Sequence, residues 1–302
     1  MTRRDTTIDL HHLGRARSVA CRLIDTTEGP VLVDPGPGAT LGALTAGLDA
    51  LGVALTDISA VLLTHIHFDH AGVTGTLVAR HPALRVYVHE RGARHLADPS
   101  RLLASATRIY GDRMDTLWGA ILPVPADRLH ALVGGETLVL GERRVAVRYT
   151  PGHAVHHVTF LDESDGTAYV GDTAGVRLPP AHVVLPVTPP PDVDREQWLA
   201  SLDAIAALTP TRLFLTHFGA SDDPATHLAE LREGLQAWTT QAHHLLEGDG
   251  TDAERADHFH AWVLTSIADR LTPDQRRAVA EFSDFRASFH GLARYWRTRS
   301  DA

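Results

Sequence analysis

The stretch Thr64-His65-Ile66-His67-Phe68-Asp69-His70-Ala71-Gly72 holds four potential metal ligands within six positions. It directly follows the apolar run 58–63, which has the length of a buried strand. Alternate side chains of an extended segment share a face, so His65 and His67 can reach one cation together. Asp69 and His70 come next, in an expected turn, where they can face a second cation. The stretch therefore predicts a metal site at the end of a strand.

Composition limits what kind of metal site and what kind of substrate the chain can have. The 302 residues include one cysteine, Cys21, so an intramolecular disulfide is excluded and metal ligands must be nitrogen or oxygen atoms. The formal net charge of -9 argues against a nucleic acid as substrate. The first residues lead into no long apolar segment of the signal-peptide kind, and no window resembles a membrane span. We therefore expect a soluble, cytoplasmic protein without a membrane partner.

The order of elements in the first half indicates a layered α/β domain. Short strands are predicted at 6–10, 18–25, 30–34, 58–63 and 85–89, and helices at 41–51 and 72–80. The segments 136–140 and 143–149 read as a hairpin. The apolar residues of the segment 98–120 have helical spacing. The segment can be a helical insertion beside the site or part of the ordinary core. Two strand-rich halves with helices between them predict two sheets with helices outside.

Three later strands each stop at a residue that binds metals. These residues are His153, Asp172 and His217. A proline-rich stretch, 185–194, must be an extended and stiff connector. Asp194 then caps a helix that contains Trp198. Because the chain supplies three further ligands at strand ends, the first cluster is better explained as a metal site than as a histidine-rich surface loop.

The last eighty residues have a different character. Segments 225–247 and 253–271 read as amphipathic helices, and a third helix is predicted to begin at Thr272-Pro273 with Phe282, Phe285, Phe289, Leu292 and Trp296 on one side. We therefore divide the chain into residues 1–222 and a C-terminal helical extension, 223–302. The apolar faces must pack on the sheets, on each other or on a second subunit, and a homodimer is one outcome. We expect the extension to cover part of the pocket mouth. A chain truncated after Asp223 is expected to stay folded and keep its metals.

Collected, the candidate ligands form a set that resembles a known family. They are His65, His67, Asp69, His70, His153, Asp172 and His217. With the turn Asp34-Pro35-Gly36, the set resembles the metallo-β-lactamase superfamily over about residues 6–220, in particular its glyoxalase II-like and lactonase-like hydrolases with the H-x-H-x-D-H motif. The resemblance implies an α/β fold, an αββα sandwich with the site at one edge, here followed by the helical extension.

The resemblance also implies a role for each residue. It places His65, His67 and His153 on one metal ion, Asp69, His70 and His217 on a second, and Asp172 between them. The ions would be two divalent cations, for which Zn2+ is favoured over Fe or Mn. A hydroxide bridging them would be the nucleophile, and Asp69 would orient it or carry a proton. The implied activity is hydrolysis of a small-molecule ester, thioester, lactone or amide.

Departures from the family's branches narrow this interpretation. His67 stands where the flavodiiron branch has Glu, and Cys21 lies far from the motifs, unlike the Cys ligand of the best-known zinc β-lactamases. The residues after Asp172 lack the Tyr common in quorum-quenching lactonases. The alternative is a mononuclear iron oxygenase of the persulfide dioxygenase type, which binds one iron through two His and one Asp. The complete set of seven ligands favours the hydrolase.

A few neighbouring residues keep two interpretations each. His156 and His157 either orient a ligand or simply pack, and Arg177 either holds an anionic substrate group or faces solvent. We expect Cys21 to be a buried thiol. The remaining histidines that we considered are interpreted as structural: His11, His12, His89 and His95.

Overall fold

The apolar run before the histidine-rich stretch forms β4 (Ala60–Leu62), a strand buried along its whole length. The structure, a computed structural model, describes residues 5–177, 183–282 and 284–300. β4 lies inside a six-stranded sheet with the order β1 (Thr6–Asp9), β2 (Ala20–Ile24), β3 (Val31–Val33), β4, β5 (Arg85–His89) and β6 (Leu129–Leu132). β3, β4, β5 and β6 run parallel, which explains why β3 and β4 are short, fully apolar runs.

A second six-stranded sheet comes from the middle of the chain. Its order is β14 (Gly219–Ser221), β13 (Arg212–Leu215), β10 (Thr167–Tyr169), β9 (Val158–Asp162), β8 (Arg143–Tyr149) and β7 (Thr137–Leu140). β7 and β8 form the predicted hairpin. The sequence analysis did not predict β6, β9 or β14. β11 (Val176–Arg177) and β12 (Val184–Leu185) form a small separate pair.

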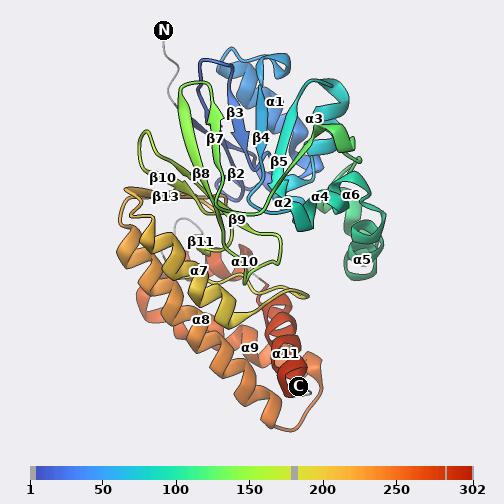
Figure 1. The fold of residues 1–302 in the computed structure, drawn as a ribbon. Helices are drawn as coiled ribbons and strands as arrows, with labels where there is room; N and C mark the ends of the chain where they lie inside the picture. Colours follow the sequence, from blue (N-terminus) through green and yellow to red (C-terminus); the bar gives the residue numbers. More distant parts are fainter. Residues whose placement is uncertain (1–4, 178–182, 283, 301–302) are drawn as a thin grey trace.

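The two sheets face each other, and helices cover their outer faces (Figure 1). Leu62 and Phe160 belong to the core between the sheets. On the outside of the first sheet, α1 (Leu41–Ala50) and α3 (Thr74–Arg80) contribute Leu44 and Leu77 to a second core. On the outside of the second sheet, α7 (Arg195–Ala207) and α8 (Pro224–Glu247) form a third. The predicted αββα sandwich is therefore confirmed.

Helix α2 (Phe68–Ala71) takes the place of the turn that we expected after the strand. Asp69 and His70 lie in this single helical turn. The peptide N–H groups of His70 and Ala71 both donate to the carbonyl of His67, so the chain coils as soon as the extended ligand pair ends. The expectation of a turn was therefore wrong, because the residues form a helical turn. This helical turn still leaves the four ligands just after β4.

The segment 98–120 is an insertion and not ordinary core. It forms α5 (Ser100–Tyr110) and α6 (Met114–Leu117), after the short helix α4 (Glu90–Ala97). Within α5 and α6 only Ala106 and Leu117 are buried. The Trp118 ring that follows lies 6.0 Å from the Phe68 ring, centroid to centroid. The insertion therefore lies against the loop that carries the first ligands.

The third helix predicted for the extension is in fact two helices, α10 (Pro273–Phe282) and α11 (Arg286–Ser300), which follow α9 (Asp252–Ser266). Thr272 caps α10, since its hydroxyl accepts from the Gln275 N–H (3.3 Å), and Asp284 caps α11 in the same way through the Arg286 N–H (3.1 Å). The Phe282 side chain lies outside the described residues. Across the described ranges, no helix is both long and apolar enough to cross a membrane.

The apolar face of the extension is buried within the extension itself and against the rest of the chain. Phe285, Phe289 and Leu292 share one core with Trp238 of α8 and Phe259 of α9. α8 also faces the second sheet with a row of leucines that pack beside Trp198 and Leu202 of α7: Leu228, Leu231 and Leu235. α8 is thus part of the outer layer of the sandwich. The domain boundary at 222/223 stays a prediction. So does the expectation that the extension covers part of the pocket mouth.

We therefore revise the expectation that the chain truncated after Asp223 stays folded. Burial of each leucine of α8 is worth about 1.5–3 kcal/mol, and a domain of this kind is stable by only about 5–15 kcal/mol. We expect the truncated chain to be insoluble, or to melt at a lower temperature than the full chain in circular dichroism. A soluble truncated chain with the melting temperature of the full protein would contradict this and would support an independent domain at 1–222.

Candidate metal centre

Four separate segments bring the seven predicted ligands together at one edge of the sandwich. The segments follow β4, β8, β10 and β13, and β10 and β13 run parallel, so their carboxyl ends meet. The ligand atoms of one group lie within 4.8 Å of one another, and so do those of a second group. The first group is His65, His67, His153 and Asp172, and the second is Asp69, His70 and His217. The structure thus places every predicted ligand in the site.

The first group has the spacing of a tetrahedral site. His67 Nδ1 lies 3.0 Å from His65 Nε2 and 3.0 Å from His153 Nε2. Asp172 Oδ2 lies 3.5 Å from His153 Nε2. Zinc bonds of about 2.0–2.1 Å in tetrahedral geometry set neighbouring ligand atoms about 3.3 Å apart. The four atoms therefore surround a point that a divalent cation fits.

Asp172 also faces the second group, through its other oxygen. Its Oδ1 lies 3.3 Å from His70 Nε2 and 3.8 Å from His217 Nε2. Asp69 Oδ2 completes this group, 3.2 Å from His217 Nε2 and 4.0 Å from His70 Nε2. One carboxylate thus presents one oxygen to each group, which is the arrangement of a ligand shared by two cations.

The protonation of the rings is set by the nitrogen that faces away from the centre. His153 Nδ1 lies 2.7 Å from the Val187 carbonyl oxygen, and His217 Nδ1 lies 2.7 Å from that of Ser18. Since a carbonyl can only accept, each Nδ1 carries the proton and donates it. Nε2 is therefore the nitrogen that each of these two rings turns to the centre, and its unprotonated form is the one that binds a metal ion.

Asp34 fixes the same arrangement for His70 directly and for His65 through Thr64, and the sequence analysis had quoted it only as part of a turn. This buried carboxylate accepts from His70 Nδ1 (2.8 Å), from the Thr64 hydroxyl (2.7 Å) and N–H (2.8 Å), and from the Thr216 hydroxyl (2.8 Å). Because the Thr64 hydroxyl uses its one proton in the hydrogen bond to Asp34, it accepts from His65 Nδ1, which lies 3.1 Å away. An Asp directly after a buried strand and before Pro-Gly was the available signal.

Burial and charge act in opposite directions on the two groups. Burial lowers the pKa of the three histidines of the first group, that of His153 to about 4, so these rings are neutral at pH 7. In the second group, burial also opposes charge on His70 and His217, but the Asp172 and Asp69 carboxylates outweigh it and raise the pKa of both rings. The same attraction holds the pKa of both carboxyl groups below its usual range.

Two atoms of the centre test whether these residues fit a metal ion. His70 Nε2 and Asp172 Oδ1 are buried and have no hydrogen-bond partner among the described residues. Buried polar atoms without a partner are costly, and His67 Nδ1, 3.0 Å from both His65 Nε2 and His153 Nε2, can donate at most one proton to the two of them. A divalent cation in each group satisfies both conditions, because it binds the lone pairs and the carboxylate oxygens together. The donor set therefore fits two metal ions.

His156 and His157 pack against the ligand rings and also hold the loops that carry them. The His157 ring stacks on His65 with centroids 5.0 Å apart, and its Nδ1 lies 3.0 Å from the Thr150 hydroxyl. The His156 ring lies edge-on to His67 at 5.7 Å, and its Nδ1 accepts from the Ile66 N–H at 3.5 Å. Of the two interpretations, packing and orientation both apply.

The other residues that we singled out lie around the centre. The Arg177 N–H donates to the His217 carbonyl (2.6 Å) and its guanidinium to the Ala220 carbonyl (3.2 Å), so the binding of a substrate anion stays a prediction. Cys21 is a buried thiol, as expected. Its pKa is raised by burial and by Asp34. His12 Nε2 lies 2.7 Å from the Leu117 carbonyl, and the ring of His89 stacks on Tyr149. His11 is exposed beside Asp9, and Arg94 donates to His95.

Solvent reaches the centre past Asp69 and His217 of the second group and past His67 of the first, which are all partly exposed. The side chain of Asp69 is 25% exposed and that of His217 is 14% exposed, against 3% for Asp172. Next to this opening, Phe68, Tyr110 and Trp118 form an aromatic wall, with the Tyr110 and Trp118 rings 5.3 Å apart. Burial and the Asp69 carboxylate both raise the pKa of Tyr110, which places the insertion near that ligand.

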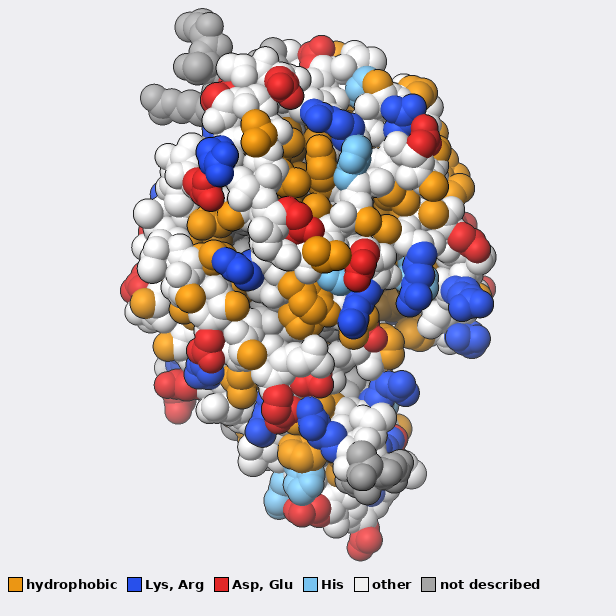
Figure 2. Space-filling view, in the orientation of Figure 1, with side chains coloured by type: hydrophobic (Ala, Val, Ile, Leu, Met, Phe, Trp, Pro, Cys, Tyr) orange, Lys and Arg blue, Asp and Glu red, His pale blue; other side chains and the backbone are white. Residues whose placement is uncertain are grey.

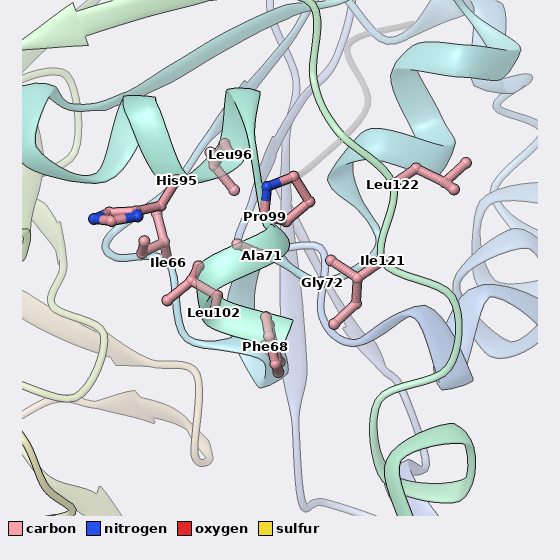
Figure 3. Close-up of a pocket in the computed structure, with 10 residues that line it drawn as sticks. All are labelled: Ile66, Phe68, Ala71, Gly72, His95, Leu96, Pro99, Leu102, Ile121 and Leu122. Carbon is pink, nitrogen blue, oxygen red and sulfur yellow. The ribbon is translucent and has the colours of Figure 1, made fainter. Parts of the chain in front are cut away.

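An apolar crevice adjoins this wall on the far side of the ligand loop. Its empty volume is about 280 Å³ with the open solvent included. Figure 3 shows Ile66 and Phe68 beside Leu102 of α5, with Ile121 and Leu122 on the opposite side. Ile66 and Phe68 alternate with the ligands in the sequence, so the loop presents ligands to the centre and apolar side chains to the crevice.

Comparison with known proteins agrees with this geometry. The model of the metallo-beta-lactamase superfamily matches residues 14–217. A metallo-beta-lactamase fold-containing protein of Sulfurisphaera tokodaii is 31% identical over 168 residues, which are 55% of this chain and 62% of that protein. A hydroxyacylglutathione hydrolase of Acidiphilium cryptum is 33% identical over 183 residues, which are 61% of this chain and 57% of that enzyme. The chain thus spans about three fifths of the length of these two relatives.

A solved structure extends the likeness to most of the chain. The crystal structure of a metallo-beta-lactamase family protein from Thermus thermophilus superposes with a TM-score of 0.68 at 26% identity. The superposition covers 93% of this chain and 89% of that one. It therefore reaches into the C-terminal helices, which lie outside the match to the superfamily model.

The role of Asp34 leads to a prediction for metal affinity. Asp34→Asn removes the carboxylate that receives the His70 Nδ1 proton, and loss of such a partner weakens metal binding about 10–100-fold. We expect that weakening in competition with a chelator, together with a loss of stability of about 1–3 kcal/mol. Asp49→Asn, at the exposed end of α1, is the matched control and should change neither. Unchanged metal affinity in Asp34→Asn would show that Asp34 does not act through His70.

Proposed function

The chain belongs to the metallo-beta-lactamase superfamily, and from this premise we propose that it is a dinuclear metal-dependent hydrolase of a small-molecule ester, thioester, lactone or amide. The superfamily binds metal ions, and the cluster of His and Asp side chains lies where such ions would be held. His65, His67 and His153 would hold one ion. The second group would hold the other, and Asp172 would bind both.

The observation that carries the proposal is the position of the Asp172 carboxylate. Its Oδ2 faces His153 at 3.5 Å and its Oδ1 faces His70 at 3.3 Å, so each oxygen belongs to a different group. A mononuclear iron oxygenase needs only two histidines and one carboxylate and would leave the second group without a role. The complete second group therefore supports the hydrolase over that alternative.

The nature of the ligands supports zinc. Five of the seven ligands are imidazoles, with two carboxylates and no thiolate. Neutral imidazole together with carboxylate is a common donor set for zinc, and hard cations such as Mg2+ prefer oxygen ligands only. We therefore take two Zn2+ ions as the cofactors, with Fe or Mn as the alternatives that metal analysis distinguishes.

The protein's own residues supply the rest of the chemistry. When bound, two such ions lower the pKa of a water that they hold and polarise a carbonyl oxygen of the substrate. Asp69 is the more exposed of the two carboxylate ligands, so it can reach that water, orient it and pass on its proton. Cys21 is buried with a raised pKa, which does not suit a nucleophile. Attack without a covalent intermediate on the protein is therefore part of the proposal.

The surroundings of the centre support a small and partly apolar substrate. The aromatic wall of Phe68, Tyr110 and Trp118 offers apolar surface beside the opening. Figure 2 shows acidic and basic side chains interspersed over the face in view, and the net charge is -9, which does not favour a nucleic acid. The name of the Acidiphilium relative, a hydroxyacylglutathione hydrolase, adds an acyl conjugate of a thiol to the candidates. Homodimerisation and a cytoplasmic location stay predictions from the sequence.

Metal analysis tests the dinuclear centre. The protein purified without chelators should contain two zinc ions per chain by elemental analysis. Asp172→Ala should lose both, because its carboxylate is a ligand in each group, whereas His217→Ala should keep one. One iron per chain in the untreated protein would favour the oxygenase. Two ions retained in Asp172→Ala would show that this carboxylate is not shared.

Activity is tested with a panel of ester, thioester, lactone, amide and β-lactam substrates. We expect hydrolysis of at least one class, loss of activity after metal removal by a chelator, and recovery with Zn2+. Asp69→Asn should lower kcat by roughly 10²–10⁴-fold, the range for loss of a general acid or base. Catalysis that persists after complete metal removal would contradict the proposal.

A further inference from the structure

The proline-rich connector forms a layer between the loop that carries His153 and helix α11. On the inner side, the Val187 carbonyl accepts the His153 Nδ1 proton at 2.7 Å. The Asp194 N–H donates to the Gly152 carbonyl at 2.9 Å, and the Asp192 carboxylate accepts from the Val155 N–H at 3.4 Å. The connector is therefore hydrogen-bonded to the segment 152–155 at three places, and one of them is the His153 side chain.

On its outer side, the connector lies against one face of α11. The buried Thr188 hydroxyl donates to the Ser288 carbonyl at 3.2 Å, and Arg294 Nε donates to the Pro191 carbonyl at 3.2 Å. Next in the helix, the Tyr295 hydroxyl lies 2.9 Å from the Glu196 carboxylate of α7. Ser288 and Tyr295 are seven positions apart and so share one face of the helix.

Gly291, in the middle of this face, lets the two backbones touch. A Cβ at this position would lie 2.0 Å from the Thr188 carbonyl oxygen and 2.8 Å from the Pro189 carbonyl carbon. Real Cβ atoms do not approach backbone atoms so closely, so a larger residue must push the helix and the connector apart. The opposite face of α11 cannot yield, because Phe289 and Leu292 are buried in the core of the extension.

We propose that α11 is a positioning element for the metal ligand His153. It holds the connector against the 152–155 loop, so that the Val187 carbonyl receives the Nδ1 proton and Nε2 stays turned to the first group. The connector transmits the contact because consecutive prolines at 189–191 have a fixed φ and form a stiff segment. The C-terminal extension thus tunes the affinity of one metal site from outside the sandwich. The inference rests on the proposed dinuclear centre.

The test uses Gly291→Ala in the full-length protein, with Gly234→Ala as its matched control. Gly234 is also a helical glycine that faces the connector, but a Cβ there would meet Pro186 Cδ at 3.4 Å and the Val184 carbonyl oxygen at 4.0 Å, both of which are ordinary contact distances. Two quantities are measured. One is the Zn2+ affinity of each site by chelator competition. The other is the hydrogen-bonded Nδ1–H signal of His153 in the NMR spectrum of the metal-free protein with labelled histidine.

Gly291→Ala should weaken one of the two sites about 10–100-fold, as loss of a histidine's hydrogen-bond partner does. The same substitution should shift or broaden the His153 Nδ1–H signal. The Nδ1–H signal of His217 should stay unchanged, because His217 donates to the Ser18 carbonyl and not to the connector. Gly234→Ala should change neither quantity. A folded Gly291→Ala protein with normal affinities and a normal His153 signal overturns the inference.

If Gly291→Ala does not fold, the same two quantities are measured for Arg294→Ala. Arg294 is exposed, so its loss removes the bond to Pro191 without opening the core, and a smaller change in the same direction is expected. No change in either quantity overturns the inference. Absence of zinc binding in the unaltered protein would instead contradict the proposed function. The His153 signal of the metal-free protein would still test whether α11 orients this ring.

Discussion

The carboxylate of Asp172 is buried between two groups of ring nitrogens, and the rest of the molecule is arranged around this constraint. A buried carboxylate is tolerated only when charges or hydrogen bonds compensate the lost water. Here its Oδ1 has no hydrogen-bond partner among the described residues, and His70 Nε2 opposite it has none either. The two atoms are 3.3 Å apart. Such a pair makes physical sense as two ligands of one cation, and on the other side Oδ2 faces His153 Nε2 at 3.5 Å.

Four of the five rings are oriented by a hydrogen bond on the side away from the centre, which helps the seven side chains to meet there. Asp34 connects three strand ends, since its carboxylate binds Thr64 after β4, Thr216 after β13 and the ring of His70. The remaining orienting groups are backbone carbonyls, those of Val187 and Ser18. The sandwich thus positions the ligands, and parts outside it, the connector and α11 above all, hold one of them in place. Metal affinity is then a property of the whole chain.

The sequence predicted the ligands well because their signal is local. The extended segment His65-Ile66-His67 that follows β4 fixes two ligands by alternation, and each of the other ligand segments also follows a strand. The layers followed from apolar runs such as that of β4. The missed features depend on tertiary contacts. Val187 acts through its carbonyl, which any residue has, and the break between α10 and α11 comes from a cap at Asp284 inside a continuous apolar pattern. The assignment of the seven residues to two metal ions remains a prediction.

Diffraction from crystals of the zinc-loaded protein, recorded at the zinc absorption edge, tests the central claim most directly. The account predicts two anomalous peaks about 3.5–4 Å apart, the separation of two-metal hydrolytic sites. One peak should lie among His65, His67 and His153, the other among Asp69, His70 and His217, with the Asp172 carboxylate between them. A single peak, or two peaks of which neither touches Asp172, would contradict the shared carboxylate and with it the dinuclear mechanism.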